Sequence, residues 1–234
     1  MPFTFQAIVL AGGLGTRLRA VVPQLPKPMA PVAGRPFLEY VLDRLVAAGC
    51  AHLVLAVAYR HEAIEAHFGS AYRGVPIVYS LEANPLGTGG AIRQAAQWIT
   101  AEPVCVVNGD TYVELDYAAM HAAHRAAGAS LTVAVCAVDD VGRYGSLTVV
   151  DERIVACAEK GGSGPGLINA GTYLIERNLI EGIPPGRVHS LEQELLVPRV
   201  AALRPLAFVC RGRFIDIGVP EDYARAQQLF AEGA

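Results

Sequence analysis

The first half of the chain alternates short apolar runs with longer amphipathic segments. The apolar runs are rich in Val, Ile, Leu and Ala and nearly continuous in hydrophobicity, a pattern typical of strands covered on both faces. Two amphipathic segments are followed by Gly49 and Gly69, where a helix C-terminus favours a left-handed residue. Strands that alternate with helices indicate βαβ units and a mainly parallel sheet. The expected strands span residues 6–11, 52–58, 76–82 and 103–108, and the expected helices span residues 36–48, 60–68 and 90–99.

The pattern changes after an expected helix at residues 116–127, because most later segments resemble strands. Ser190 and Gln193 fit a capping box at the start of a helix, and Pro198 should kink or shorten that helix. The sequence therefore predicts one α/β domain with a Rossmann-like, doubly wound, mainly parallel but mixed sheet flanked by helices, with extra strands in its second half. The expected later strands span residues 130–138, 146–150, 154–158, 167–175 and 206–210, and the expected later helices span residues 190–202 and 221–230.

Composition limits the classes of partner. The 234 residues are 53% hydrophobic and 18% charged, which is typical of a globular domain of this length. The formal net charge is −3 and no dense Lys/Arg tract is present, so the electrostatic footprint of nucleic-acid or membrane-surface binding is missing. Any anionic ligand must therefore be met by a few local cations.

The five cysteines are odd in number and widely spaced, and they contain no C-x-x-C pair. This usage favours reduced, buried, structural thiols in a cytoplasmic protein. The first apolar run has no basic segment before it, which argues against a signal peptide, and no run approaches membrane-spanning length. The six histidines form no pattern typical of a zinc site.

The residues that follow the apolar runs carry most of the polar chemistry. In doubly wound sheets ligands bind beyond the carboxyl ends of the strands, so residues 12–17, 82–90 and 109–111 should meet at one cleft. The first of these stretches has a G-x-G spacing at Gly13 and Gly15. It lacks the third glycine of the dinucleotide fingerprint, since Leu18 stands in that place, and it lacks the G-K-[ST] ending of a Walker A loop.

Glycines alone fit a tight turn as well as a phosphate cradle, in which bare backbone N–H groups approach an anion. Arg17, Arg19 and Lys27 follow closely and favour phosphate binding. Arginine can grip a phosphate with two parallel N–H donors, while lysine provides a compact charge. For Arg19 alone a solvated helix residue remains the favoured interpretation.

The segment LAGGLGTRL, followed by PKPM at residues 26–29, resembles the sugar-nucleotidyltransferase family, which joins a sugar 1-phosphate to a nucleoside triphosphate and releases pyrophosphate. The resemblance extends over nearly the whole chain and agrees with the α/β fold. It implies that Arg17 and Lys27 are catalytic and contact phosphates. It also implies that the triphosphate is wrapped by Leu10, Ala11, Gly12, Gly13, Gly15 and Thr16.

Two aspartates are candidates for a metal site. Asp110 ends the segment Asn108-Gly109-Asp110, and Mg²⁺ prefers carboxylate oxygens. A turn or cap aspartate is the alternative. Asp216 lies in the apolar segment FIDIG, where a carboxylate costs free energy unless it is paired or metal-bound. The family resemblance implies that Asp110, which is also catalytic, and Asp216 together hold Mg²⁺, and that Asn108 contacts the nucleotide.

The resemblance also implies contacts to the base and to the acceptor. Gly87 and Thr88 would contact the nucleotide, and Glu82 could accept hydrogen bonds from guanine, although a solvated or capping role fits it equally well. Lys160 would neutralise the attacking phosphate, and the sugar hydroxyls would be bound by Gly145, Glu159, Asn169 and Gly171. These assignments divide the chain into a nucleotide-binding half at about 1–128 and a sugar-phosphate-binding half at about 129–234.

Within the family, segments such as NGDTY and FIDIGVPEDY are most similar to members that use GTP and a heptose 1-phosphate. The implied reaction is a direct, Mg²⁺-assisted in-line displacement by a monomer or small homo-oligomer. Three alternatives stay open: a mannose 1-phosphate guanylyltransferase, an amino-sugar 1-phosphate uridylyltransferase, and a non-catalytic subunit that binds sugar nucleotides.

Overall fold

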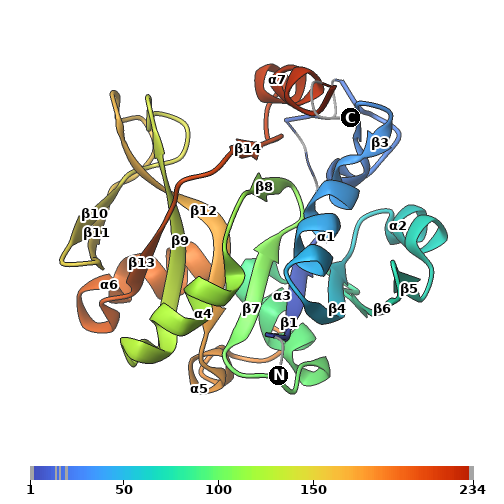
Figure 1. The fold of residues 1–234 in the computed structure, drawn as a ribbon. Helices are drawn as coiled ribbons and strands as arrows, with labels where there is room; N and C mark the ends of the chain where they lie inside the picture. The colour runs from blue at the N-terminus through green and yellow to red at the C-terminus, as the bar shows by residue number, and fades with distance from the viewer. Residues whose placement is uncertain (1–2, 14, 16, 19–20, 232–234) are drawn as a thin grey trace.

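A ten-stranded mixed sheet forms the centre of the computed structural model, which describes residues 3–13, 15, 17–18 and 21–231 (Figure 1). The strand order is β10-β11-β13-β9-β12-β7-β1-β4-β6-β5. The strands are β1 (Phe5–Leu10), β4 (Cys50–Val57), β5 (Ala71–Tyr72), β6 (Val75–Leu81), β7 (Val104–Asn108), β9 (Leu131–Val138), β10 (Leu147–Val150), β11 (Arg153–Cys157), β12 (Gly166–Ile175) and β13 (Leu206–Cys210).

The strands β7, β1, β4 and β6 pair in parallel, as the βαβ pattern predicts. The next strand, β12, is antiparallel to both β7 and β9, so strands from the two halves of the chain share one sheet. The expected mixed α/β fold, with extra strands in the second half, is confirmed. Two small sheets join β2 (Pro31–Val32) to β3 (Arg35–Pro36), and β8 (Thr111–Val113) to β14 (Phe214–Asp216).

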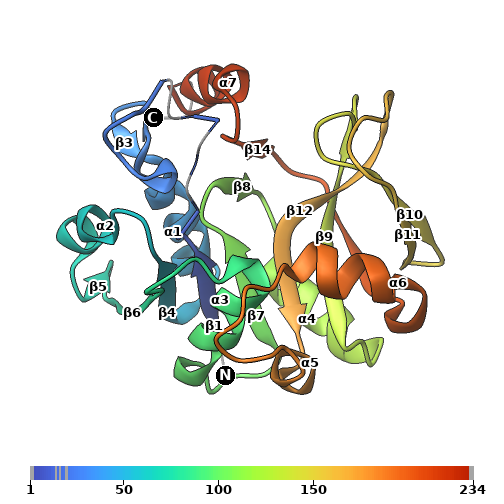
Figure 2. The same cartoon turned by 180° about the vertical axis from the view of Figure 1, so that it is seen from behind.

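Helices cover both faces of the sheet (Figures 1 and 2). Ala7 and Val9 of β1 are fully buried in one hydrophobic cluster with residues of α1 and α4, whereas Ile8 is fully buried in the other with residues of α3 and α5. Burial on both sides explains the continuous hydrophobicity of the strand sequences. The helices are α1 (Phe37–Ala47), α2 (His61–Phe68), α3 (Gly87–Ala95), α4 (Tyr117–Ala126), α5 (Arg177–Glu181), α6 (Val197–Leu203) and α7 (Pro220–Ala231), with the short helices η1 (Lys27–Met29), η2 (Ala96–Trp98) and η3 (Leu191–Leu196).

Two helices differ from their expected bounds. The helix α3 begins at Gly87 and not at Gly90, because the carbonyl of His189 accepts hydrogen bonds from the backbone N–H groups of Gly89 and Gly90 and so caps the glycine run. The helix expected over residues 190–202 is divided into the π-helix η3 and the α-helix α6, whose first turn contains Pro198.

The expected capping box at Ser190 is half correct. The Ser190 hydroxyl accepts from the backbone N–H of Gln193, as predicted. The reciprocal bond comes from Glu194, whose carboxylate accepts from the Ser190 N–H, and not from Gln193.

The five cysteines are free thiols, and four of them are buried. Cys157 differs from the expectation, because it is only half-buried at the end of β11. In the part of the chain that the structure describes, no helix has both the length and the apolarity needed to cross a bilayer.

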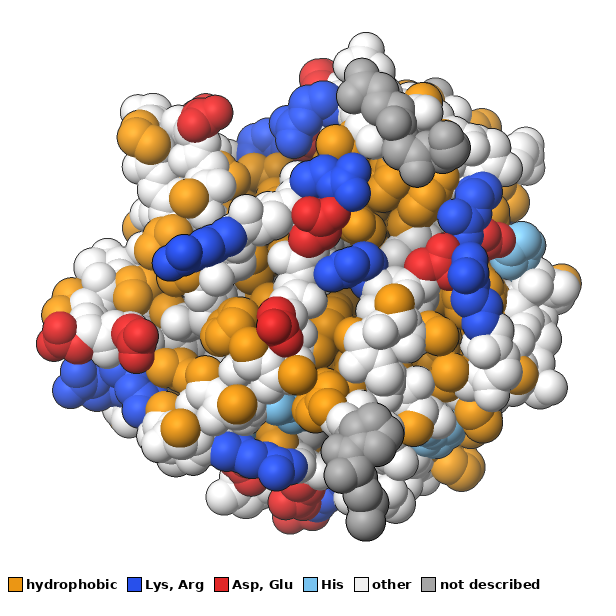
Figure 3. Space-filling view, in the orientation of Figure 1, with side chains coloured by type: hydrophobic (Ala, Val, Ile, Leu, Met, Phe, Trp, Pro, Cys, Tyr) orange, Lys and Arg blue, Asp and Glu red, His pale blue; other side chains and the backbone are white. Residues whose placement is uncertain are grey.

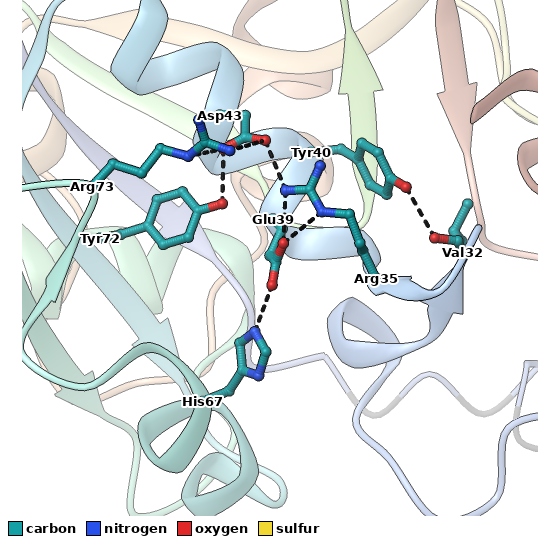
Figure 4. A network of polar contacts seen from close by, with 8 residues as sticks. All are labelled: Val32, Arg35, Glu39, Tyr40, Asp43, His67, Tyr72 and Arg73. Atoms are coloured by element: carbon teal, nitrogen blue, oxygen red, sulfur yellow. Dashed lines mark hydrogen bonds and ion pairs between the residues drawn. The ribbon is translucent and has the colours of Figure 1, made fainter. Parts of the chain in front are cut away.

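A polar network ties the β2–β3 hairpin to α1, directly after the segment that carries Lys27 (Figure 4). The Arg35 guanidinium donates to Glu39 and Asp43 on successive turns of α1, and its pKa is raised mainly by the hydrogen bond to Asp43. Asp43 also accepts from Tyr72 and Arg73 of the β5–β6 hairpin. The network therefore connects the β2–β3 hairpin, α1 and the β5–β6 hairpin, although β4 and α2 lie between α1 and β5 in the sequence.

Charged side chains of both signs are scattered over the described part of the face in Figure 3, among apolar ones. Charge that acts on a polyanion is therefore best sought within the pockets of the molecule.

We predict that acid destabilises the fold through His121, which is 5% exposed and packs edge-on against Phe3. Burial, with smaller contributions from Arg125 and His124, lowers its pKa to about 4. The unfolded chain binds this proton more readily below its ordinary pKa, so stability falls as the pH decreases from 6.5 towards 4. Between pH 7 and pH 5, the loss of free energy of unfolding should be about 2 kcal/mol smaller in His121→Phe than in wild type.

Denaturant titrations at the two pH values measure this difference. The control is His52→Phe, the same substitution at a half-buried histidine of β4. An equal pH response in wild type and His121→Phe would contradict the assignment.

Candidate active site

A pocket of about 260 Å³ lies at the carboxyl ends of β1 and β7, where the topology predicts ligand binding. It brings together most of the residues expected to contact the nucleotide, although they lie far apart in the sequence. Pro28 and Gly218 also line it and were not predicted. The lining consists of Leu10, Gly13, Gly15, Arg17, Lys27, Pro28, Thr88, Asn108, Asp110 and Gly218.

Four other predicted nucleotide residues do not line this pocket. Ala11 extends the β1–β4 pairing through a backbone bond to Ala56. Glu82 is buried, and one of its carboxylate oxygens accepts from the Leu86 N–H at 2.8 Å. Burial raises the pKa of Glu82, although the bond from Leu86 opposes this shift. Its other oxygen lies so close to Gly12 that a side chain there would collide with it.

The fourth, Gly87, packs against the backbone of His189. Thr16 and Arg19 lie outside the described residues. Leu18, which replaces the third glycine of a dinucleotide fingerprint, is 1% exposed and belongs to the hydrophobic core. The loop is therefore anchored by an apolar side chain at that position.

Lys27 lies between two carboxylates and is the centre of the pocket's charge. Its ammonium donates to Asp110 at 2.6 Å and to Asp216 at 3.2 Å, and its side chain is only 10% exposed. Burial alone lowers the pKa of Lys27, but the attraction of the two carboxylates outweighs it and the net pKa is raised. Lys27 therefore remains a cation over the whole neutral range.

Local structure explains how these three side chains meet. Pro26 is extended and Lys27 begins the short helix η1, so the two flanking prolines fix the backbone around the lysine. Asp110 lies two residues after the end of β7. Asp216 is brought beside it because β14 pairs antiparallel with β8, with Asp216 opposite Thr111. This pairing joins residues separated by more than a hundred positions.

The arrangement fits a hard divalent cation. Two carboxylates already converge on one positive group, and burial raises the pKa of Asp216 despite the opposing effect of Lys27. Among the described residues no group of three or more His, Cys, Asp and Glu side chains converges. Such a pair suits Mg²⁺, which usually keeps waters and shares phosphate oxygens with one or two carboxylates.

A second pocket, of about 400 Å³, contains most of the residues expected to bind the sugar phosphate. Gly145, Glu159, Lys160 and Asn169 line it, whereas Gly171 does not and instead packs against the Asn108 side chain. Lys27 and Lys160 are the only lysines in the sequence, and each lies in a different pocket. The rest of the lining consists of Tyr144, Ser146, Leu147, Cys157, Ala158, Glu192, Gln193, Leu196 and Val197.

Sequence reasoning missed the contribution of η3 to this pocket. Glu192, Gln193 and Leu196 come from a segment whose only local signal was the capping residue Ser190. An irregularity in β12 also escaped prediction: the pairing with β9 shifts between Asn169 and Tyr173, which directs Asn169 into the pocket.

We predict that Gly15 is required for the placement of Lys27. Gly15 has φ +57° and an added Cβ would lie 2.8 Å from the Cβ of Lys27, whereas Gly128 has φ +54° and open space around it. Gly15→Ala and Gly128→Ala therefore share the cost of a left-handed alanine, about 1 kcal/mol. Gly15→Ala should lose more free energy of unfolding than Gly128→Ala, because the added methyl group must displace Lys27. Chemical denaturation measures both losses. Equal losses in both variants would show that the contact with Lys27 is unimportant.

Comparison with known proteins agrees with this geometry. The family model for nucleotidyl transferases matches residues 6–233. A D-glycero-alpha-D-manno-heptose 1-phosphate guanylyltransferase from Aneurinibacillus thermoaerophilus is 41% identical over 95% of this chain and 97% of its own length. A mannose-1-phosphate guanylyltransferase from Mycobacterium tuberculosis is 38% identical over 97% of this chain and 65% of its own length.

Among solved structures, HddC from Yersinia pseudotuberculosis complexed with GMP-PN has a TM-score of 0.85 and 38% identity, over 97% of this chain and 99% of that chain. Sequence and fold therefore agree over nearly the full length. The chain belongs to the nucleotidyl transferase family.

Proposed function

We propose that this chain transfers the guanylyl group of GTP to D-glycero-α-D-manno-heptose 1-phosphate, with release of pyrophosphate. The observation that carries the reaction type is the position of Lys27, held by Asp110 and Asp216 beside the glycine loop. The choice of GTP and heptose rests on the 41% identical relative that bears this activity in its name.

The first half of the chain, about 1–128, would bind the nucleotide. The backbone from Leu10 to Gly13 and at Gly15 would cradle the triphosphate, with Thr16 beside it, because small residues let N–H groups approach phosphate oxygens closely. Arg17 is exposed and lines the pocket, where its guanidinium would bind phosphate oxygens.

The base would be read by a carboxylate. Guanine presents two neighbouring N–H donors on its Watson–Crick edge, and Glu82 is the buried carboxylate closest to the loop, against Gly12. The hydrogen bond from Leu86 holds it in place. Thr88 and Asn108 line the same pocket as the phosphate loop, and Gly87 opens the helix that carries Thr88.

The second half, about 129–234, would bind the acceptor. The exposed Lys160 would neutralise the attacking phosphate. Glu159 would accept hydrogen bonds from the sugar hydroxyls, and Asn169 would donate hydrogen bonds to them. Backbone groups at Gly145 and Gly171 complete this assignment. The two pockets are lined by residues from different halves of one sheet, which suits a reaction between two separately bound substrates.

The chemistry would be a direct in-line displacement. A phosphate oxygen of the sugar 1-phosphate forms a bond to the α-phosphorus of GTP, and the bond between that phosphorus and the bridging oxygen of pyrophosphate breaks. Lys27 and Arg17 stabilise the negative charge that develops, because fixed cations need no reorganisation during the reaction. Asp110 and Asp216 would hold Mg²⁺, which when bound neutralises phosphate charge.

Further parts of the proposal concern assembly and location. The pockets described above are built within one chain, so a monomer or a small homo-oligomer would both be active. We place the reaction in the cytoplasm, where GTP is available.

A panel of nucleoside triphosphates against sugar 1-phosphates, scored by pyrophosphate release, tests the proposed substrates. We expect the highest kcat/KM for GTP with the heptose 1-phosphate, because a carboxylate such as Glu82 has no pair of donors to bind in uracil. Higher kcat/KM with mannose 1-phosphate would favour the activity named for the Mycobacterium tuberculosis relative. Release from UTP with an amino-sugar phosphate would overturn the base assignment, and no turnover with any pair would favour a non-catalytic role.

Substitutions at the charged centre test the mechanism. Lys27→Ala and Asp110→Asn should each reduce kcat at least about 100-fold, because each removes a group that acts on developing charge. The matched control is Asp116→Asn at the N-cap of α4, where asparagine also caps and turnover should stay near wild type. Near-normal turnover by a folded Lys27→Ala or Asp110→Asn protein would refute these roles.

A further inference from the structure

A partly buried series of hydrogen bonds links the two pockets, and the chemistry above does not use its central residue, Glu192. This series of hydrogen bonds begins at Thr88 in the nucleotide pocket and ends at Asn169 in the acceptor pocket. Glu192 of η3 stands between them. Its carboxylate binds Thr88 of helix α3, Tyr173 of strand β12 and Ser190 at the start of η3.

Glu192 uses both carboxylate oxygens. One oxygen accepts from the Thr88 hydroxyl at 2.7 Å and from the Ser190 hydroxyl at 3.1 Å. The other accepts from the Tyr173 hydroxyl at 3.0 Å. All three donors are neutral hydroxyls, so the carboxylate is the only charged member of this cluster.

The branch through Tyr173 ends at the sugar pocket. Tyr173 is 1% exposed, and burial, reinforced by Glu192, raises the pKa of its hydroxyl well above the ordinary value. The hydroxyl therefore stays protonated and donates a hydrogen bond to Glu192, while its oxygen accepts from the Asn169 side-chain amide at 2.9 Å. The amide oxygen of Asn169 accepts from the Gly171 N–H, so the orientation of the Asn169 side chain is fixed from both ends.

The branch through Thr88 has independent support. The Thr88 hydroxyl also accepts from the Leu191 N–H at 2.9 Å, and the His189 carbonyl caps the first turn of α3. A Cβ at Gly89 would lie 2.6 Å from the His189 ring. The absence of a side chain at this glycine therefore lets the segment around His189 pack directly against α3. Helix α3 and the segment at residues 189–191 are thus also joined by contacts that do not involve Glu192, whereas the Tyr173 hydroxyl donates its hydrogen bond to that carboxylate.

We infer that Glu192 is a positioning residue for the acceptor: through Tyr173 it fixes the orientation of Asn169, and through Thr88 it holds the acceptor pocket against the nucleotide loop. The inference rests on the proposed function, since it assigns the acceptor to the pocket that contains Asn169. Glu192 itself has its oxygens occupied by protein donors and acts through its neighbours.

The test compares two identical substitutions two residues apart, in the full chain. Glu192→Gln keeps the size of the side chain but replaces one acceptor oxygen by an N–H donor, so it cannot accept on both sides. Its control is Glu194→Gln, because Glu194 is exposed and accepts from the Ser190 N–H through one oxygen, which glutamine retains. We expect Glu192→Gln to raise the KM for the sugar 1-phosphate about tenfold. The dissociation constant of GTP should change less than about threefold, and Glu194→Gln should resemble wild type in both quantities.

Tyr173→Phe provides a second measurement. It breaks the same connection at its middle, so it should raise the acceptor KM alone, and the double variant Glu192→Gln/Tyr173→Phe should lose no more than the stronger single variant. A purely structural role would instead lower the melting temperature and impair both substrates together.

The outcomes separate the inference from the proposed function. Turnover by wild type with an unchanged acceptor KM in Glu192→Gln would overturn the inference alone. Equal losses for both substrates, or additive losses in the double variant, would also overturn it. Absence of turnover in wild type would overturn the proposed function and, with it, the assignment of the acceptor pocket.

Discussion

The ion triad formed by Lys27, Asp110 and Asp216 is the constraint on which the site depends. Two carboxylates half-buried at one point repel each other and lose hydration, so they persist only if a cation shares the space. The fold supplies that cation from the first residue of the short helix η1, which lies between two prolines, and it supplies the second carboxylate through the short β8–β14 pairing. The position of Gly15 follows, because this glycine packs directly on Lys27. A small antiparallel ladder thus governs the electrostatics of a pocket formed by a parallel sheet.

The parts predicted well from sequence are those governed by local pattern. Strands such as β1 and β4 are buried on both faces, and a run of consecutive hydrophobic residues predicts this burial. Asp216 was also detectable, since a carboxylate in an apolar run needs a partner. Its partner Lys27 was not, because the pattern suggested phosphate for the lysine and metal for the aspartates, and gave no sign that they bind each other.

The parts that escaped prediction depend on long-range approach. The glycines near Thr88 were interpreted as a nucleotide loop. They also allow the segment around His189, far away in the sequence, to pack against them, and no local feature encodes that contact. Glu192 lies in a π-helix whose sequence resembles an ordinary capped helix. The pairing of β12 with β9 shifts register between Asn169 and Tyr173, next to the residues that pair with β7. Local propensity carries no information on any of these arrangements.

The scarcity of lysine gives the site an unusual chemical selectivity. Lys27 is nearly inaccessible and its proton is held by two carboxylates, so its amine is a poor nucleophile, whereas Lys160 is exposed in the second pocket. The sequence contains no other side-chain amine. Acylating reagents, or an enzyme that acetylates lysine, would therefore modify one side chain before any other. A single acetyl group would remove the ammonium charge from the pocket that contains Lys160 and leave Lys27, in the other pocket, unmodified.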